Sequence, residues 1–503
     1  MKIFCRIAAF ALATVMLLSM LVSCAPTDGG EGEQGQNTQA ATVETDPYAT
    51  KLPDKDWEGK ELLVIGVRND VQEHFSNFEI ARDELPDDVV GKAVWDRNNA
   101  LKAKYNFVIK QELVEDMEKD LLGKYNTGTE LYDLAFYAID GGFIHAQQGF
   151  LKDLREVEYV DLTHPSWNQY ATEQLTISGR TFISTSDMTL KTLDTVYVTW
   201  YNREMARQNN LGQLEDMVKN NTWTLDNCYS ILKGFADDAD GDGSMGGKKD
   251  GFGLAADSRE HTYAFIVGGG YRLTTNEDGD LKFVEADEKT KGIIDKVAKF
   301  AYNKDITMMA QTYGNDDSVW NLPADAFAEE RALMRTGHLF SMRSRFLDMV
   351  QFEFGYLPFP KYDADQKEYY APINVWNGSG VAVPGTVPDT KLDFVGFALQ
   401  AMTEASTKTV YHAYYETKCK HQDSYDQLCA DMLDIIFEHV VYDVGTIVDL
   451  GRTADDKRDG FYSVVTITLP TIRKNTYMTI YSKKADNAKG QLQDIINDFA
   501  AIE

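Results

Sequence analysis

The sequence has few cysteines, few prolines and few histidines. Five cysteines and 12 prolines among 503 residues exclude a small disulfide framework, and the 37 glycines show no collagen-like period. The eight histidines form no His-Glu-x-x-His zinc motif. Basic residues are outnumbered, 50 against 79 acidic ones, so the net charge is −29. Because such an acidic surface repels phosphate groups, we expect no nucleic-acid partner.

What remains is the composition of a folded globular protein. Hydrophobic residues make up 43% of the chain and charged residues 26%, which excludes a fully disordered chain. At about 150 residues per domain, the length predicts two or three domains with a large core.

The N-terminus carries an export pattern. Lys2 and Arg6 precede an uncharged apolar stretch over 7–23, and no second long apolar run follows. This pattern predicts a secretory signal rather than a membrane-spanning helix. The sequence Leu-Val-Ser-Cys at 21–24 resembles the lipobox of bacterial lipoproteins, in which the cysteine is diacylated. We therefore predict a lipoprotein signal peptide over 1–23, with an ordinary signal peptide as the alternative.

The composition of the segment after the apolar stretch predicts that this segment is a flexible tether. Residues 24–57 begin at the predicted lipidated Cys24 and are rich in Gly, Gln, Thr and acidic residues. They contain too few large apolar groups to fold, so we expect a flexible link between a lipid anchor and a folded body. The cysteines of that body, Cys228, Cys419 and Cys429, form no metal motif. A pairing of Cys419 with Cys429 stays open.

Strand-like and helix-like patterns alternate in the body. Apolar runs at 61–67, 107–114 and 131–139 predict strands, with a helix at 91–105 between the first two. This alternation predicts an α/β fold with largely parallel sheets. Further strands are predicted at 180–186, 195–201, 332–340 and 354–358, and helices around 428–440 and 492–499.

Several stretches follow one another in a suggestive order. They are 179–187 (GRTFISTSD), 195–203 (TVYVTWYNR), 222–226 (TWTLD), 250–254 (DGFGL), 327–337 (FAEERALMRTG) and 354–361 (FGYLPFPK). Together they resemble the extracellular solute-binding proteins of ABC importers, in the family-1, carbohydrate-type group. Glu329 and Glu330 stand near that family's usual glycine, which is a departure.

The resemblance implies a type II periplasmic-binding-protein fold. In that fold two α/β lobes are joined by hinge strands, and the ligand lies in the cleft between them. We place lobe one at 58–190 and 380–450, and lobe two at 191–379 and 451–503.

Ligand contacts are expected from aromatic and polar side chains at strand ends, because sugars stack on rings and need hydrogen bonds. Tyr137 precedes a Gly-Gly loop, with a core tyrosine as the alternative. Asp187 lies in the loop after the predicted strand 180–186, and a turn-forming aspartate is its alternative. Arg343 follows the 332–340 strand and could instead make a surface salt bridge. Trp376 and Asn377 precede Gly-Ser-Gly in a predicted exposed loop.

An acidic loop resembles an EF-hand calcium loop. Asp238, Asp240, Asp242 and Gly243 match its positions one, three, five and six. Position twelve would be a lysine, and Asp250 comes one residue late. Either the loop binds a structural Ca²⁺ with Asp250 as the late ligand, or it is a solvated turn.

These observations predict a lipid-anchored protein on the extracytoplasmic face of the cell membrane. It would capture a sugar or oligosaccharide and deliver it to an ABC permease, a partner that only the resemblance implies. We expect no catalysis and no required cofactor. The alternatives are an exported glycosidase and an adhesin lipoprotein. Sequence spacing does not reveal the paired carboxylates of a glycosidase, because their separation is spatial.

Overall fold

The structure is a computed structural model that describes residues 46–502 except 72, 130–131, 247–248, 278, 315–316, 344–348, 416–426 and 454–457. The chain divides into Met1–Ala49 and a compact unit, Thr50–Glu503. Cys24, the signal peptide and most of the tether lie outside the described residues, and so does Cys419. Cys228 and Cys429 are buried. The lipidation site therefore stays a prediction.

The first sheet has the strand order β12-β3-β1-β2. β1 pairs in parallel with β2 and with β3, and β12 runs antiparallel to β3. The apolar run that predicts β1 is buried on both faces of the sheet, as parallel strands require. The strands are β1 (Lys60–Val67), β2 (Phe107–Val114), β3 (Leu134–Ala138) and β12 (Ser379–Ala382).

The second sheet has the order β10-β4-β9-β5-β8. β5 pairs in parallel with β8 and β9, whereas β4 runs antiparallel to both β9 and β10. The strands are β4 (Tyr197–Asn202), β5 (Phe252–Ala256), β8 (Thr307–Met309), β9 (Ala332–His338) and β10 (Phe354–Leu357). The described residues also form two small two-stranded sheets. One pairs β6 (Thr274–Glu277) with β7 (Asp280–Phe283), and the other pairs β11 (Ala371–Pro372) with β13 (Val440–Val441).

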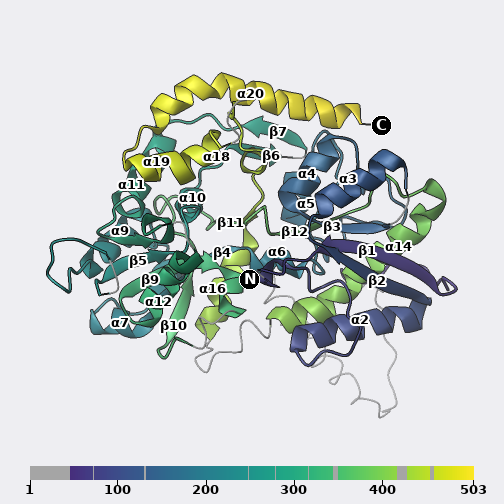
Figure 1. Ribbon diagram of the computed structural model, residues 1–503, viewed down its shortest axis with the longest axis horizontal. Coiled ribbons are helices and arrows are strands. Elements are labelled where there is room, and N and C mark those ends of the chain that lie inside the picture. Colours follow the sequence, from purple (N-terminus) through teal and green to yellow (C-terminus); the bar gives the residue numbers. More distant parts are fainter. Residues whose placement is uncertain are drawn as a thin grey trace, which may run out of the picture. The chain divides into compact units, whose positions relative to one another are not determined.

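Both sheets share one topology. In the first sheet β1 lies between β2 and β3, and the antiparallel strand β12 lies next to β3. In the second sheet β5 lies between β8 and β9, and the antiparallel strand β4 lies next to β9. Each of these two antiparallel strands follows in sequence the parallel strands of the other sheet: β4 comes after β1–β3, and β12 comes after β5, β8 and β9. The chain therefore crosses from the first sheet to the second and back, and the two sheets are seen at opposite sides of Figure 1.

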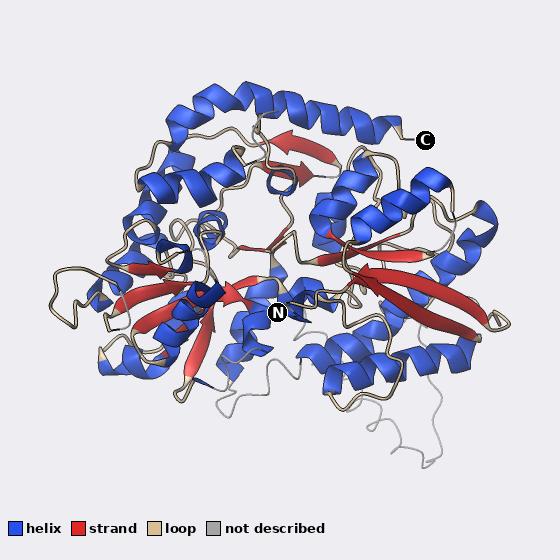
Figure 2. Ribbon diagram, in the orientation of Figure 1, coloured by secondary structure: helices blue, strands red, loops and turns tan. Residues whose placement is uncertain are grey.

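Helices cover both faces of the first sheet (Figure 2). Leu62 and Val64 of β1 belong to the same hydrophobic cluster as Phe394 of α14 (Asp389–Ser406). The alternate residue Ile65 instead clusters with Met117 of α3 (Met117–Thr127). This alternation follows from the two-residue period of a strand.

Local signals explain where the helices begin and end. Asp88 caps α2 (Val89–Tyr105) by accepting a hydrogen bond from Gly91 N at 2.7 Å, and Asn106 ends it in the left-handed conformation. The other helices of the first half are α4 (Ile139–Gln147), α5 (Gln169–Leu175) and α6 (Leu190–Asp194). Those of the second half are α7 (Arg203–Gln208), α8 (Leu214–Lys219), α9 (Leu225–Leu232), α10 (His261–Gly268), α11 (Glu288–Ala301) and α12 (Leu322–Ala328).

The C-terminal third is helical, as its apolar spacing predicts. It contains α16 (Gln427–Glu438), α17 (Val444–Ile447), α18 (Phe461–Ser463), α19 (Leu469–Ile472) and α20 (Tyr477–Ala501). α16 packs against β10 of the second sheet, although the predicted boundaries assign it to lobe one. Those boundaries stay a prediction.

The prediction of a strand at 180–186 is wrong. The segment makes only isolated bridges, such as Trp167 with Ser186, Ile177 with Arg180 and Ser184 with Val381. Because its bridging residues face three different partners, no continuous ladder forms.

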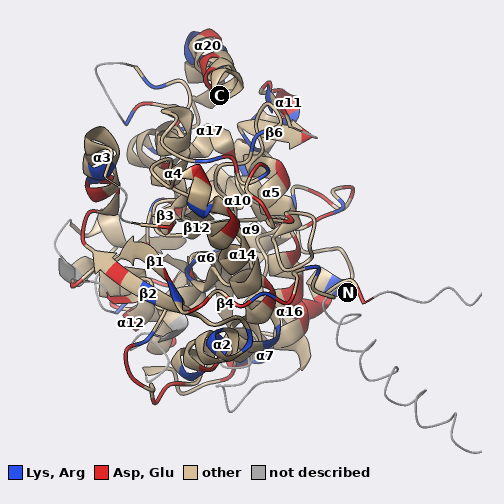
Figure 3. Cartoon of the chain, turned by 90° about the vertical axis from the view of Figure 1, so that its right-hand side faces the viewer, with Lys and Arg blue, Asp and Glu red and all other residues tan. Residues whose placement is uncertain are grey.

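Charged residues of both signs are spread over the chain, with the acidic excess that the sequence requires (Figure 3). Among the described residues, no helix combines the length and the apolar character that crossing a membrane needs.

Candidate functional site

The ends of the central strands indicate where a site can form. Open α/β sheets bind ligands outside the carboxyl ends of their parallel strands. In the first sheet β3 ends at Ala138, and in the second β5 ends at Ala256 and β9 at His338. The antiparallel strands start at the same edges, because Ser379 pairs with Ala138 and Tyr197 pairs with His338.

Aromatic rings from both halves meet at these edges. His74, in the short helix η1 (Glu73–Phe75) after β1, stacks on Phe340, which follows β9, with ring centroids 4.2 Å apart. Phe75 lies edge-on to the same ring at 5.1 Å. Phe340 also stacks on His338 at 5.1 Å, and His338 lies 4.4 Å from Tyr197. With His261, 5.0 Å from Tyr197, these rings form what we call the edge cluster: His74, Phe75, Tyr197, His261, His338 and Phe340.

Two imidazoles of the edge cluster are uncharged at neutral pH. Burial holds the pKa of His261 well below its usual range, and its electrostatic coupling to His338 and Arg335 adds to this effect. Burial likewise lowers the pKa of His338 to about 3, helped by His74 and Arg335. A neutral imidazole keeps one N–H donor and one acceptor. Neither ring nitrogen of His261 has a hydrogen-bond partner among the described residues, so that capacity is unused.

An ion pair fixes two strand ends of the second sheet relative to each other. Arg335 of β9 donates two hydrogen bonds to Asp257, the residue after β5, at 2.9 and 2.8 Å. The guanidinium group also lies over the Trp200 ring, 5.2 Å from its centroid. Burial raises the pKa of Asp257 although Arg335 opposes that rise. Such a bidentate pair restricts the orientation of both side chains, which makes it a positioning element next to the edge cluster.

The matching edge of the first sheet carries two half-buried acids. Asp140 lies two residues after the end of β3, in the first turn of α4, and burial raises its pKa to about 7, with a smaller contribution from Glu118. Burial also raises the pKa of Glu118. The backbone N–H of Asp140 donates to Val375 O at 3.3 Å, which places this acid beside the segment that contains Trp376.

Trp376 and Asn377 lie just before β12, next to these edges, and their contact with a ligand stays a prediction. Asn374 connects them to the edge cluster, because its Nδ2 lies 3.3 Å from His338 Nε2. The same side chain accepts a hydrogen bond from Trp376 N, and its backbone oxygen accepts one from Asn377 N. The Trp376 ring packs at 5.0 Å from the Tyr462 ring and is still 39% exposed. An exposed indole is thus held next to buried rings.

The other three predicted ligand residues make internal contacts or are only partly described. Tyr137 lies in β3, is 1% exposed and has its hydroxyl 2.9 Å from His145 Nδ1, which is the environment of the core tyrosine given as the alternative. Asp187 is half-buried and accepts a hydrogen bond from Thr407 Oγ1 at 2.7 Å. The backbone of Arg343 ends the short helix η5 (Leu339–Arg343) after β9, but its side chain lies outside the described residues.

The acidic loop brings together three of its four predicted ligands. Asp238, Asp240 and Asp250 each have a carboxylate oxygen in one group, whose atoms lie within 4.8 Å of one another. Asp242 is exposed and accepts a hydrogen bond from Ser244 N at 2.8 Å.

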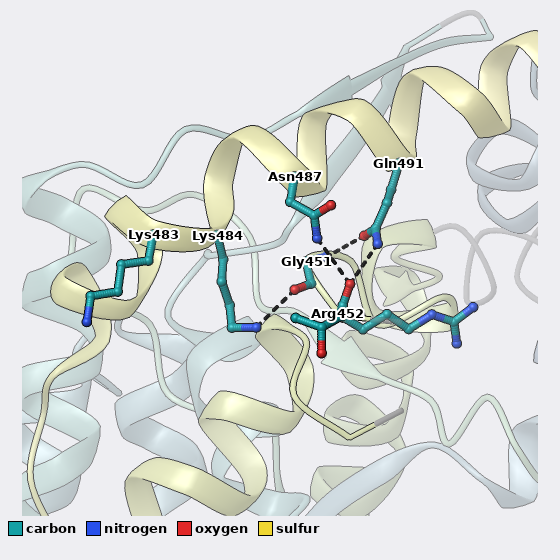
Figure 4. Close-up of a pocket in the computed structure, with 7 residues that line it drawn as sticks. Gly451, Arg452, Lys483, Lys484, Asn487 and Gln491 are labelled. Carbon is teal, nitrogen blue, oxygen red and sulfur yellow. Dashed lines mark hydrogen bonds between the residues drawn. The ribbon is translucent and has the colours of Figure 1, made fainter. Parts of the chain in front are cut away.

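A hollow of about 490 Å³ lies between the loop 451–453 and α20 (Figure 4). Lys484 and Asn487 donate to the backbone oxygens of Gly451 and Arg452, both at 3.1 Å, and Gln491 Oε1 accepts from Gly451 N at 2.7 Å. These polar groups fasten the loop to the helix. No aromatic residue lines the hollow, so it lacks the rings on which a sugar stacks.

The edge-cluster residues were not predicted as ligand contacts. His338 and Phe340 stand at the end of the predicted strand 332–340, so the strand-end rule could have selected them. His261 follows a strand end by five residues, and His74 lies in a segment with no strand pattern. For those two residues the sequence contains no local signal.

Solved structures with the same fold include sugar-binding proteins. The maltose/maltodextrin-binding domain MalE of Bdellovibrio bacteriovorus, bound to maltotriose, aligns with a TM-score of 0.51 over 86% of this chain and 100% of its own, at 11% identity. The maltose-binding periplasmic protein MalE of Listeria monocytogenes, in complex with maltose, gives 0.52 over 86% and 98%, at 13% identity. UspC of M. tuberculosis gives 0.54 over 86% and 99%, at 12% identity.

The chain has the two-lobe fold of periplasmic sugar-binding proteins. No family model and no curated protein matches it. At 11–13% identity the solved structures establish the fold alone. The predicted fold class is confirmed: two α/β lobes, built on the two sheets, with chain crossings between them.

Proposed function

We propose that this protein is an extracytoplasmic solute-binding protein that captures a sugar or oligosaccharide between its lobes and releases it unaltered. The observation that supports this most directly is the edge cluster, in which rings from both halves meet at the strand ends. Two-lobe binding proteins close around a ligand by hinge motion, so residues at both edges can enclose it.

The chemistry of the site suits a carbohydrate. The C–H faces of a sugar pack on aromatic rings, and its hydroxyls need hydrogen-bond partners that replace water. Trp376 offers an exposed ring, and His261 offers ring nitrogens without a partner among the described residues. Asp140 and Glu118 add carboxyl groups that bind hydroxyls as donors or acceptors.

Solved relatives in fold support the same class of ligand. The B. bacteriovorus domain is bound to maltotriose and the L. monocytogenes protein to maltose. By analogy with these proteins, a glucose oligosaccharide is the first ligand to test here.

Delivery and anchoring complete the proposal. The resemblance to ABC-importer solute-binding proteins supports an ABC permease as the membrane partner, and the lipobox at 21–24 supports a diacylated Cys24. Mass spectrometry of the membrane-bound protein would detect the lipid on residue 24. Cys24→Ala should release the protein from the membrane fraction, and a protein that stays bound would contradict the anchor.

The central experiment is a thermal-shift screen of the purified protein against mono- and oligosaccharides. A bound sugar should raise the melting temperature, because ligand binding favours the folded state. Trp376→Ala should weaken the binding of that sugar about tenfold, since a stacking ring contributes roughly 0.5–1.5 kcal/mol beyond its buried area.

The matched control is Tyr125→Ala. Tyr125 is an aromatic residue of similar exposure, 37% against 39% for Trp376. It lies in the last turn of α3, which leads back to the start of β3, the edge opposite the candidate site. Affinity should be unchanged in this variant. Stabilisation by peptides but by no sugar would contradict the ligand class, and release of sugar products would favour the exported glycosidase.

A further inference from the structure

The acidic loop joins the short helix η2 (Lys233–Phe235) to β5 of the second sheet. Its two ends are pinned together, because Asp237 and Gly251 exchange backbone hydrogen bonds of 3.0 and 2.9 Å. The residues between Asp237 and Gly251 therefore form a loop whose two ends are held together. β5 itself ends next to Asp257, so the loop begins the strand that leads to the candidate sugar site.

Three carboxylates converge in this loop. Asp238, Asp240 and Asp250 each contribute one oxygen to a group whose atoms lie within 4.8 Å of one another. Like charges at such distances repel unless a cation or a proton neutralises them. Lys249 is a described cation that pairs with the group, and its Nζ is 3.9 Å from Asp240 while its side chain is 73% exposed. A solvated lysine at that distance compensates little of the charge.

The Asp250 carboxylate gives a second, independent indication of a ligand. Asp250 is 1% exposed, and its Oδ1 has no hydrogen-bond partner among the described residues. Its Oδ2 accepts one hydrogen bond, from Gly246 N at 2.7 Å. Arg331 is close, but it donates to the backbone oxygen of Asp250 rather than to the carboxylate. An unpartnered buried carboxylate oxygen is costly, and a bound cation would remove that cost.

We infer that Asp238, Asp240 and Asp250 form a Ca²⁺ site. Carboxylate oxygens are the ligands that hard divalent cations prefer, and Ca²⁺ accepts irregular sets of six to eight of them. The three carboxylate oxygens lie close enough together to share one such ion. Asp250 would supply the buried ligand, and the two loop aspartates would close over the ion.

The bound ion would fasten the acidic loop to the start of β5 and stabilise the second lobe. Its role is structural, because the loop lies before β5 in the chain whereas the edge cluster lies beyond the carboxyl end of that strand. Sugar binding and calcium binding are therefore separate properties, and an experiment that contradicts one proposal leaves the other unaffected.

Calcium titration of the full chain, after treatment with a chelator, tests the site. Addition of CaCl₂ should raise the melting temperature by about 2 °C or more at saturation. Asp250→Asn and Asp240→Asn should each abolish the shift. Asp240 lies in the exposed part of the loop, so its variant should fold even if the Asp250 variant does not. Asp242→Asn is the matched control and should keep the shift, because Asp242 belongs to the same loop but not to the group.

Terbium luminescence gives a readout that a change in stability alone would not move. Tyr313 lies beside the loop, and the charge of Asp250 contributes, after burial, to the raised pKa of its hydroxyl. Excitation of this ring should sensitise emission from Tb³⁺ bound in place of Ca²⁺. Tyr313→Phe should reduce the emission and keep the calcium-induced shift. The inference is overturned if about 1 mM Ca²⁺ changes neither signal, or if Mg²⁺ alone produces an equal shift.

Discussion

Asp140 illustrates what burial does to a single side chain at the strand-end edge. It follows β3, and burial raises the pKa of its carboxyl group to about 7. In an unfolded chain the same group has a pKa near 3.9. Between about pH 4 and pH 7 the folded state therefore binds more protons than the unfolded state. The contribution of Asp140 to stability is present at low pH and is lost as pH rises through 7.

Replacing Asp140 by Asn should remove this pH dependence. The amide is neutral at every pH, so the variant should gain melting temperature relative to the parent as pH increases from 4 to 8. Circular dichroism melts at several pH values measure the difference. Asp96→Asn, on the exposed face of α2, is the control and should show no such trend. A constant difference between Asp140→Asn and the parent would show that Asp140 does not titrate in this range.

Helix α20 is the longest described element, and it links the two halves of the fold. Near its start, Tyr477 contacts Tyr271, and Asn475 donates to Asp295 of α11 at 2.7 Å. At its other end, Phe499 packs on Phe143 of α4 with ring centroids 5.2 Å apart. Figure 1 shows the helix running from α11 toward α3 and α4. An apolar stripe, rather than a run of charges, fastens it to both.

Truncation of Phe499 should therefore destabilise the protein. Phe499 is 1% exposed and also lies against Phe182, so Phe499→Ala should create a cavity that costs about 3–5 kcal/mol. Urea unfolding at constant pH measures the loss. Gln493→Ala, on the exposed face of the same helix, should change the free energy of unfolding by less than about 0.5 kcal/mol. Equal effects of both variants would mean that the helix end is not packed.

At the scale of the whole molecule, the two sheets are connected by crossing segments. Val196 and Ile373 bridge two of these segments in antiparallel pairing, and Asn374 N donates to Thr195 O at 3.0 Å. Paired crossing segments of this kind allow two rigid lobes to rotate as units. The rings of the edge cluster lie where such a rotation would bring the lobes together.

Sugar binding should therefore change the shape of the protein in solution. Small-angle X-ray scattering with the sugar found in the thermal-shift screen should give a smaller radius of gyration than scattering without it, because closure brings the lobes together. Trp376→Ala at the same sugar concentration should show a smaller decrease. An unchanged radius at saturating sugar would mean that the ligand binds without closure of the lobes.

The strands and helices with strong patterns were predicted from the sequence alone. β1, β2 and α2 lie within one or two residues of the predicted ranges, since an apolar run or a helical period depends only on neighbours in the chain. The order of motifs also predicted the fold class. The strand predicted at 180–186 failed because the partners of a strand are chosen by the tertiary structure and not by the strand itself.

The candidate site shows where sequence information ends. Trp376 and Asn377 were predicted because a tryptophan before Asn-Gly-Ser-Gly indicates an exposed loop. The contact of His74 with Phe340, the unused nitrogens of His261 and the raised pKa of Asp140 depend on groups far apart in the chain. Composition, export pattern and local elements follow from the sequence, because each depends on residues close together in it. Only the tertiary structure decided which rings are in contact and which carboxyl groups are desolvated, because burial and contact are properties of the packed chain.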